Sequence, residues 1–495
     1  MRVLFVYPNV TRPRTPQMGL LALGSYLIHH GVEVAICDLT FVEATRFLDY
    51  ILADIARHKP DLLGFSIRTM EFPVVRELLK EIRNRHPDLL IIAGGHHATL
   101  VPNDLVGLVD FGVAGDGEEV CLEIVQALAD GRRAHLHEIQ SLFYLRDETL
   151  IRNPLRAMFD LANAPLPRFE LFDERHYREH SFLRLVPGAS VCGVFEGSRG
   201  CPYQCTYCSN AALMDLNKQG GRWRREKDVG QLRREIDHFR ARYGLDMIYF
   251  VDEVIMTSDA RTLALKEGLE DLRTPFIFME RPELIRETRV AHIKAAGAYS
   301  CSIGIESGDE TFRQQLLKRR MSDDKIKKSF DLMHQHGIHT HAFIMMGLPG
   351  QEEEVMRESV RLLQEIQPTT AQATTFYPLP ATELRDETVR QGLLDPDNQP
   401  NTYYALSALA YPLAFKKKIK MYADMVNLSL WKRSPIQDVT VWLCMRWSFL
   451  FPLVDWYMNS PAGYRRYRSI RAMSWTQIGR KILQKLGFSA VVKSR

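Results

Sequence analysis

The sequence predicts an α/β protein in three parts: an N-terminal doubly wound, Rossmann-like domain, a central partial (β/α)6 barrel and a mostly helical C-terminal extension. Two observations predict the first two parts. Short apolar runs alternate with helical patterns over residues 2–130, and again over residues 191–392. Such alternation is typical of parallel sheets covered by helices. The third observation is that the alternation ends beyond Asp395. We therefore expect domains at 1–150, 189–392 and 393–495, with a linker at 151–188.

The composition of the chain is that of an ordinary globular protein. Of its 495 residues, 46% are hydrophobic and 25% are charged, and this length suits two or three domains. Five of the eight cysteines are scattered and the other three lie close together at 201–208, and the N-terminus begins with a strand-like run and not with a signal peptide. A reducing cytoplasm is the expected compartment.

The N-terminal part contains five expected strands, and loops follow their carboxyl ends. The strands are expected at 3–7, 33–37, 62–66, 89–93 and 110–114, and the helices at 18–30, 42–57, 74–85 and 118–128. Ligands of doubly wound sheets bind beyond the carboxyl ends of the strands. The loops there cover residues 8–18, 67–70, 94–99 and 115–117, and their glycines and polar groups let backbone approach a large ligand closely.

The central part contains six expected βα units. The strands are expected at 191–196, 247–251, 276–279, 299–305, 340–346 and 371–376, and the helices at 228–243, 259–272, 282–295, 324–336, 352–366 and 383–391. Six units suit a partial barrel, whose catalytic groups gather at the carboxyl ends of the strands. Prolines and a lack of periodicity mark the preceding segment as a linker.

Three cysteines with C-x3-C-x2-C spacing follow the first strand of the expected barrel. They are Cys201, Cys205 and Cys208, and a compact loop can direct three thiolates to one face of a metal cluster. A four-iron cluster takes four cysteine ligands, so three would leave one iron open. The alternatives are a structural zinc site or three unrelated cysteines. Zinc takes paired ligand spacings, and no second Cys-x2-Cys pair is present.

This cysteine loop resembles that of the radical S-adenosylmethionine (radical SAM) superfamily. The match includes the aromatic Tyr207 before the third cysteine. The resemblance implies that the thiolates hold a 4Fe–4S cluster and that the amino and carboxylate groups of SAM chelate the fourth iron.

Further motifs of the superfamily lie at the ends of later strands. They are YFVDE, IGIESG and MGLPGQ, the last with Gln351 where the family pattern has Glu. By resemblance, the residues expected to contact SAM are Tyr207, Asp252, Glu253, Glu306, Ser307, Gly347, Leu348 and Pro349. Each carboxylate alone would more often be a helix cap or a surface group. Phe195, Glu196 and Arg199 lie beside the cysteine loop, where a structural role is also open.

Two loops of the N-terminal part, GGHHATLVPND and GVAGDGEEV, resemble the cobalamin-binding domain that precedes many radical SAM modules. The residues implied to contact cobalamin are Met18, Gly19, Ser66, Arg68, Thr69, Gly94, Gly95, His97, Ala98, Gly115, Asp116, Gly117 and Glu118. The Asp-x-His-x-x-Gly motif, which supplies a cobalt ligand in the classical domain, is missing from the first loop. We therefore interpret His96 and His97 as polar loop residues and not as cobalt ligands. The alternative is a degenerate domain that serves only as a scaffold.

The C-terminal region is basic and rich in tryptophan. Residues 416–495 contain 16 Lys or Arg against three acids, a local charge of +13, which leaves −9 for the rest of a chain of net charge +4. Its apolar runs are interrupted before they reach the roughly 18 residues of a spanning helix. Residues 476–488 form a basic amphipathic pattern that suits an anionic bilayer surface. A helical cap on the barrel is the alternative, and nucleic acid is disfavoured because the aromatic residues lie in apolar runs.

The two resemblances imply a cobalamin-dependent radical SAM enzyme. The family most often transfers the methyl group of methylcobalamin, with the help of a 5′-deoxyadenosyl radical, to an unactivated carbon. We expect a hydrophobic small-molecule substrate and a reductant such as flavodoxin or ferredoxin, and we assign no catalytic side chain. A radical oxidative cyclase with the same modules is the first alternative. A non-enzymatic iron–sulfur carrier or sensor is the second. The methylthiotransferases of transfer RNA are disfavoured, because their N-terminal three-cysteine set is absent.

Overall fold

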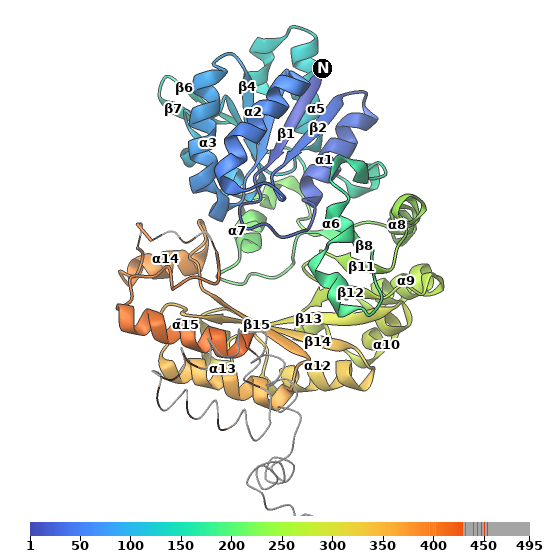
Figure 1. Ribbon diagram of the computed structural model, residues 1–495, viewed down its shortest axis with the longest axis vertical. Coiled ribbons are helices and arrows are strands. Elements are labelled where there is room, and N and C mark those ends of the chain that lie inside the picture. The colour runs from blue at the N-terminus through green and yellow to red at the C-terminus, as the bar shows by residue number, and fades with distance from the viewer. Residues whose placement is uncertain are drawn as a thin grey trace, which may run out of the picture.

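The computed structural model describes residues 1–428 apart from 396, 399 and 401, together with 431, 439, 443, 447, 450 and 453. It shows two α/β domains stacked on one another, with the short helix α7 (Ser209–Leu216) between them (Figure 1). The α/β class and the order of the parts were predicted from the sequence and are confirmed.

The N-terminal domain is a doubly wound sheet with strand order β2-β1-β3-β4-β5-β6-β7. The first five strands are parallel. Their bounds are β1 Arg2–Tyr7, β2 Glu33–Asp38, β3 Leu62–Ser66, β4 Leu90–Gly94 and β5 Phe111–Val113. The main helices are α1 Met18–His29, α2 Phe47–His58, α3 Phe72–Arg85, α4 Gly95–Leu100 and α5 Glu118–Ala129. Apolar residues of α1 and α5 pack on one face of the sheet, and those of α2 and α3 pack on the other.

A hairpin at the sheet edge was missed by the sequence analysis. Strands β6 (Leu142–Arg146) and β7 (Thr149–Arg152) pair antiparallel to each other, and β6 pairs antiparallel to β5. The turn between them places Asp147 and Glu148 at φ of 45° and 62°. Because glycine or asparagine normally marks such a turn, the sequence carries no hairpin signal here. The sheet therefore extends to Arg152, beyond the expected boundary at residue 150.

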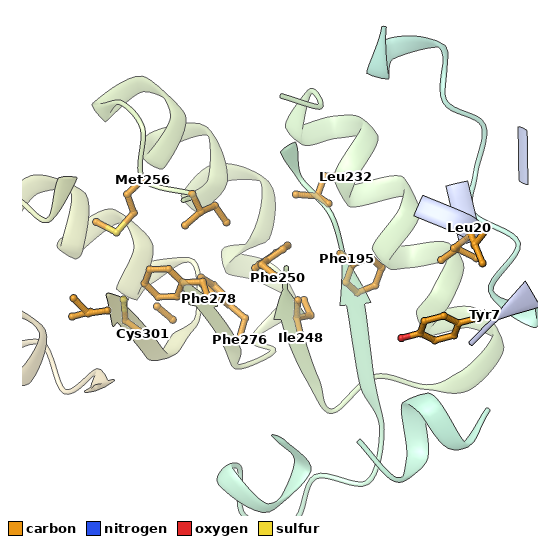
Figure 2. Close-up of a cluster of buried hydrophobic side chains, with 14 of the residues drawn as sticks. Tyr7, Leu20, Phe195, Leu232, Ile248, Phe250, Met256, Phe276, Phe278 and Cys301 are labelled. Carbon is orange, nitrogen blue, oxygen red and sulfur yellow. The ribbon is translucent and has the colours of Figure 1, made fainter. Parts of the chain in front are cut away.

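The second domain is an open barrel of six parallel strands with order β15-β14-β13-β12-β11-β8. The strands are β8 Cys192–Phe195, β11 Met247–Phe250, β12 Phe276–Glu280, β13 Ala298–Glu306, β14 His339–Met346 and β15 Thr370–Thr375. The outer helices include α8 Val229–Tyr243, α9 Asp259–Leu269, α10 Glu287–Ala295, α12 Asp323–Gln335 and α13 Glu353–Ile366. Figure 2 shows the layer between sheet and helices, where Phe195, Phe250 and Phe278 lie near Leu232 of α8 and Met256.

Shorter elements complete this domain near the open end of the barrel. A two-stranded ribbon joins β9 (Ser198–Arg199) to β10 (Arg225–Glu226). The helices α6 (Arg175–Arg178), α11 (Glu310–Gln315) and α14 (Glu383–Arg390) lie in the connecting segments. The ribbon brackets the cysteine loop, because β9 directly precedes it and β10 follows α7.

The described part of the C-terminal region is helical. Helix α15 (Leu413–Asn427) packs against β14 and β15, and Trp431 is buried, with its indole N–H donating to the carbonyl of Val426 at 3.2 Å. The amphipathic pattern at 476–488 and Trp442, Trp456 and Trp475 lie outside the described residues. Among the helices that the structure describes, none has the length and apolar character needed to cross a bilayer.

Candidate active site at the domain interface

The three cysteines lie together in the loop between β9 and α7. The amide of Cys208 donates to the carbonyl of Cys205 at 3.1 Å, which folds the loop into a turn. Burial raises the pKa of Cys201 to about 11 and that of Cys208 to about 12, and the neighbouring Cys205 and Glu253 add to both shifts. Both side chains are therefore neutral thiols at physiological pH, and binding of iron would release their protons.

The donor set of this loop fits an iron–sulfur cluster better than a single ion. Among the described residues, no three His, Cys, Asp or Glu side chains gather in a way that could hold one metal ion. Each thiolate of a four-iron cluster binds a different iron, so the three sulfurs need not converge on one point. A four-iron cluster held by these three thiols would have one iron open to SAM.

Two buried arginines converge on Cys205. Arg281, 6% exposed, donates from Nη1 to the sulfur at 2.9 Å, and Nη1 of Arg319, 3% exposed, lies 3.6 Å from the same atom. The guanidinium of Arg281 also stacks over the ring of Tyr203 at 3.7 Å. Charge-assisted N–H groups of this kind would stabilise a thiolate or a cluster that carries negative charge.

The sequence analysis missed both arginines. Arg281 directly follows β12, so its strand-end position was an available signal. Arg319 lies in the loop before α12, where nothing in the sequence distinguishes it from Arg320. Its place is set by a hydrogen bond from Nη2 to the carbonyl of Gly304 at 2.5 Å and by one from Nη1 to the hydroxyl of Tyr207 at 3.2 Å.

Glu253 and Glu306 of the predicted SAM set lie near the cysteine loop. Glu253 accepts a hydrogen bond from Asn210 at 3.1 Å, and burial raises its pKa. Burial also raises the pKa of Glu306, although the charge of Arg319 and the hydroxyl of Tyr207 oppose the shift. Glu306 has φ of +72°, a region that non-glycine residues rarely adopt. Both carboxylates could accept hydrogen bonds from a polar ligand.

Asp252, the other predicted SAM ligand of the YFVDE motif, forms hydrogen bonds within the protein. It is buried, and its carboxylate accepts hydrogen bonds from the Ser198 hydroxyl and from the Gly197 amide, the latter at 2.9 Å. Burial raises its pKa to about 6. Its geometry braces the end of β8 against the end of β11 and leaves ligand contact to the adjacent Glu253.

The GLPG loop after β14 is stabilised by hydrogen bonds to the side chain of the next residue, Gln351. The side-chain carbonyl of Gln351 accepts hydrogen bonds from the amides of Gly347 at 2.6 Å and Leu348 at 3.3 Å. Gly347, Leu348 and Pro349 are all buried, and Leu348 packs in a cluster with Tyr207 and other apolar side chains. Ser307 is fully buried as well. These residues shape the strand ends that would receive an adenosyl group.

The carboxyl ends of the N-terminal strands open into a cavity of about 390 Å³. Of the residues predicted to contact cobalamin, nine line it: Gly19, Ser66, Arg68, Gly94, Gly95, Gly115, Asp116, Gly117 and Glu118. The opposite wall belongs to the barrel domain and includes Ser198, Gly200, Asn210, Trp223 and Glu253. Gln17, Asn210 and Trp223 were not singled out from the sequence. The cavity thus joins the N-terminal loops to the cysteine loop.

The remaining predicted cobalamin residues lie outside the wall of this cavity. They are Met18, Thr69, His97 and Ala98. His97 is buried and stacks on Phe72 with a centroid distance of 4.3 Å, and its Nε2 lies 3.3 Å from Asp104. His96, in contrast, lines the cavity. The geometry therefore gives His97 a structural position and His96 access to a ligand.

Hydrogen bonds fix the glycine-rich loops relative to one another. The hydroxyl of Thr99 donates to the carbonyl of Gly95 at 3.0 Å and accepts from the amide of Gly115 at 3.1 Å. Gly95 has φ of +90°, and a Cβ there would lie 2.8 Å from the carbonyl oxygen of Ile67. Only glycine suits that position. Both loops contribute residues to the cavity wall, so these hydrogen bonds also fix that part of the wall.

An ion-pair network joins the two domains at the edge of the cavity. Arg199 donates from Nη1 to Glu118 at 2.7 Å and from Nε to Glu196 at 2.9 Å, and Nη1 of Arg225 donates to Asp116 at 2.6 Å. Asp116 also accepts a hydrogen bond from the amide of Phe159 in the linker at 3.0 Å. We refer to Asp116, Glu118, Arg199 and Arg225 as the interdomain clamp. Helix α7 lies against α4 beside it.

Two family models match the chain in the order of its domains. A model of the B12 binding domain matches residues 9–125, and a model of the radical SAM superfamily matches residues 195–363. The first match contains the N-terminal loops described above, and the second contains the cysteine loop and the motifs after β11, β13 and β14.

Three curated relatives resemble the chain over most of its length. An uncharacterized methyltransferase of Pyrococcus horikoshii is 25% identical over 410 residues, 80% of this chain and 84% of the relative. An anaerobic magnesium-protoporphyrin IX monomethyl ester cyclase of Synechocystis sp. is 26% identical over 68% of this chain and 67% of the relative. The hopanoid C-3 methylase of Methylococcus capsulatus is 25% identical over 77% of this chain and 72% of the relative.

Two solved structures share the fold. The radical SAM methyltransferase TsrM from Kitasatospora setae, with cobalamin and a 4Fe–4S cluster bound, superposes with a TM-score of 0.65 at 19% identity over 85% of this chain and 81% of TsrM. The cobalamin-dependent SAM radical enzyme OxsB, with aqua-cobalamin and SAM bound, gives 0.67 at 16% identity over 99% of this chain and 80% of OxsB.

The matches and the geometry agree on the cofactors, which are a 4Fe–4S cluster, SAM and cobalamin. The two cofactor domains occur in one chain, in the order expected from the sequence, and face one another across a shared cavity. The protein is a radical SAM enzyme of the branch that carries an N-terminal B12-binding domain.

Proposed function

We propose that the protein is a methyltransferase that places a methyl group on an unactivated carbon of a hydrophobic small molecule. One observation carries this proposal: a single cavity is lined on one side by the loops after β3, β4 and β5 and on the other by the end of the barrel that holds the cysteine loop. A methyl donor held by the first wall and a radical-generating centre held by the second can then reach the same substrate atom.

The residues of the chain would bind and orient the cofactors. Cys201, Cys205 and Cys208 would hold the cluster, and Glu253 and Glu306 would accept hydrogen bonds from the polar groups of SAM. When bound, the cluster and SAM supply one-electron chemistry, and cobalamin supplies a transferable methyl group. The protein contributes position and exclusion of water. The interdomain clamp would hold the two walls of the cavity in a fixed position relative to each other.

The hydrophobic substrate is suggested by the relatives and by the C-terminal region. The hopanoid methylase and the protoporphyrin ester cyclase act, by their names, on polycyclic molecules. The C-terminal region is basic and rich in tryptophan, which suits contact with an anionic membrane surface. On α15, however, Lys416, Lys418 and Lys420 are paired with Asp395, Glu353 and Asp424. A membrane contact would therefore rest mainly on residues beyond Leu428.

The first test uses protein purified without oxygen and reconstituted with iron and sulfide. We expect about one cobalamin and one four-iron cluster per chain, reductive cleavage of SAM with a flavodoxin-type reductant, and a product heavier by one methylene. Binding of a cluster without cobalamin would reduce the N-terminal domain to a scaffold. Absence of SAM cleavage under a strong reductant would instead favour an iron–sulfur carrier or sensor.

The second candidate function is an oxidative cyclase, because the Synechocystis relative has that activity. The mass of the product distinguishes the two reactions. A cyclase oxidises its substrate without added carbon, whereas a methyltransferase adds the methyl carbon of SAM. SAM labelled with heavy carbon in its methyl group would therefore label the product only if the protein is a methyltransferase.

The membrane contact has its own test. We expect that a chain truncated after residue 428 loses sedimentation with anionic vesicles and keeps cobalamin, cluster and SAM cleavage. If the truncated and full chains sediment equally, the contact does not depend on the C-terminal region.

A further inference from the structure

A second cavity, of about 140 Å³, adjoins the first. Arg68 and His96 line both cavities, so these two side chains stand between them. The other walls come from three separate parts of the chain. They are Thr11, Thr69, Met70, Glu71 and Leu100 of the N-terminal domain, Ser209 of α7, and Leu379 and Tyr403 from the segments after β15. No cofactor motif contains Leu379 or Tyr403.

The wall of this cavity includes residues next to both predicted cofactor sites. Ser209 directly follows the cluster cysteine Cys208, and Arg68 ends the loop after β3 that also faces the larger cavity. Tyr403 lies on the wall of the same cavity as Arg68 and Ser209. A molecule in this cavity would contact both domains at once.

The wall that carries Tyr403 and Leu379 is held rigidly by the end of the barrel. Thr375, the last residue of β15, donates from its amide to the carbonyl of Tyr403 at 2.8 Å and from its hydroxyl to the same atom at 3.0 Å. The hydroxyl of Thr382 donates to the carbonyl of Leu379 at 2.7 Å. Tyr377 packs edge-to-face on Tyr403 with a centroid distance of 6.4 Å. A wall fixed in this way loses little entropy when it binds a ligand.

The charges around the cavity cancel. Arg68 forms an ion pair with the buried Glu71 and donates to the side chain of Asn9 at 3.0 Å. Burial lowers the pKa of His96, with the charge of Arg68 adding to the shift, so His96 is neutral. An ionised ligand would lose its hydration here without meeting a compensating net charge. The apolar side chains of Met70, Leu100 and Leu379 and the ring of Tyr403 suit an uncharged ligand instead.

We propose that this second cavity is the substrate subsite and that it takes an uncharged, largely apolar part of the substrate against Tyr403 and Leu379. The assignment to substrate rests on the proposed methyl transfer, whereas the binding of an apolar ligand does not.

The test measures binding of two related probes to the full chain loaded with cluster and cobalamin, by equilibrium dialysis. N-phenylnaphthylamine is uncharged and aromatic, and anilinonaphthalenesulfonate is its anionic analogue. We expect the uncharged probe to bind at least about tenfold more tightly than the anionic one. Tyr403→Ala should weaken binding of the uncharged probe by about tenfold, and Tyr403→Phe should keep it within about twofold.

Tyr404→Ala is the matched control. Tyr404 is the next residue, is 50% exposed and does not line the cavity, whereas Tyr403 is 40% exposed and does. Binding of the probe should therefore be unchanged in this variant. Equal binding by the wild type and Tyr403→Ala would overturn the proposal. Loss of cobalamin stoichiometry in Tyr403→Ala would also overturn it, because the cavity would then belong to the corrin site.

The outcomes separate this inference from the proposed function. If the probe binds through Tyr403 but no substrate gains a methyl group, the apolar subsite stands and the methyl transfer falls. If methyl transfer occurs and its KM is the same in the wild type and in Tyr403→Ala, the methyl transfer stands and the subsite falls.

Discussion

Nη1 of Arg199 donates to Oε1 of Glu118 at 2.7 Å, so the strand that leads into the cysteine loop is bonded to the first turn of α5 in the other domain. Both side chains are largely buried. We expect Glu118→Gln to lower the free energy of unfolding by about 2 kcal/mol, because Arg199 loses one carboxylate partner of a buried, charge-assisted hydrogen bond while it keeps Glu196. Retention of cobalamin during gel filtration should fall with it.

An exposed ion pair provides the comparison for this variant. Arg233 pairs with Asp271 on the outside of the barrel, where the Asp271 side chain is mostly exposed. Asp271→Asn should cost less than about 1 kcal/mol and leave cobalamin in place. Equal effects of the two substitutions would show that the clamp does not couple the domains.

Substitution of any of Cys201, Cys205 or Cys208 by alanine should abolish binding of a four-iron cluster. Each thiolate holds its own iron, so the remaining two cannot retain the cubane. Iron and sulfide content and the visible absorbance of the reconstituted protein measure this outcome. Cys192→Ala, in the buried strand β8, should keep the cluster and lose only stability. Full iron content in any of the three loop variants would contradict the assignment.

Arg319 should raise the reduction potential of the cluster. Reduction adds negative charge, which the guanidinium beside Cys205 stabilises. We expect Arg319→Gln to lower the midpoint potential by on the order of 50 mV, roughly a tenfold change in the equilibrium for one electron. A redox titration followed by electron paramagnetic resonance measures it. Arg320→Gln, at the exposed neighbouring position, should leave the potential unchanged.

Gly95→Ala should destabilise the N-terminal domain by at least about 2 kcal/mol. Its φ is +90°, and the added Cβ would meet the backbone of Ile67. Chemical denaturation measures the loss. Gly19→Ala, in the first turn of α1, meets no atom within 4 Å and should be neutral or slightly stabilising. A neutral Gly95→Ala would mean that the loop after β4 is not constrained as the structure indicates.

Asp252 should make the unfolding free energy fall as the pH rises. Burial raises its pKa in the folded protein to about 6, from an ordinary value of 3.8. The protonated form is therefore favoured by folding, so its contribution is fully present below about pH 4 and is lost as the pH rises through 6. The loss amounts to roughly 3 kcal/mol. Unfolding measured between pH 4 and 8 should show a shallower slope for Asp252→Asn, and an unchanged slope would contradict this assignment.

The fold was largely predictable from the sequence because its signals are local. Strand and helix periods identify both sheets, and the cysteine spacing marks the end of β8. The hairpin β6–β7 was not predictable, because Asp147 and Glu148 form its turn without glycine. The local sequence pattern does not predict positive φ angles at these two residues.

The candidate site was less predictable from the sequence, because adjacent residues in a motif can face opposite ways. His96 and His97 are neighbours, yet His96 lines the cavity while His97 stacks on Phe72 in the core. Likewise, Asp252 forms hydrogen bonds to Gly197 and Ser198, whereas Glu253 lines the cavity. Arg319 reaches Cys205 only through a loop whose course no sequence pattern specifies.

The interdomain clamp also has a consequence for protein engineering. Asp116 and Glu118 belong to the segment after β5 that lines the large cavity, but their partners Arg199 and Arg225 belong to the other domain. A chimaera that exchanged the first 150 residues with those of a relative would bring new loop residues to two unaltered arginines. The B12 module of this enzyme is therefore not freely interchangeable, and a working hybrid would have to transplant these four positions as a set.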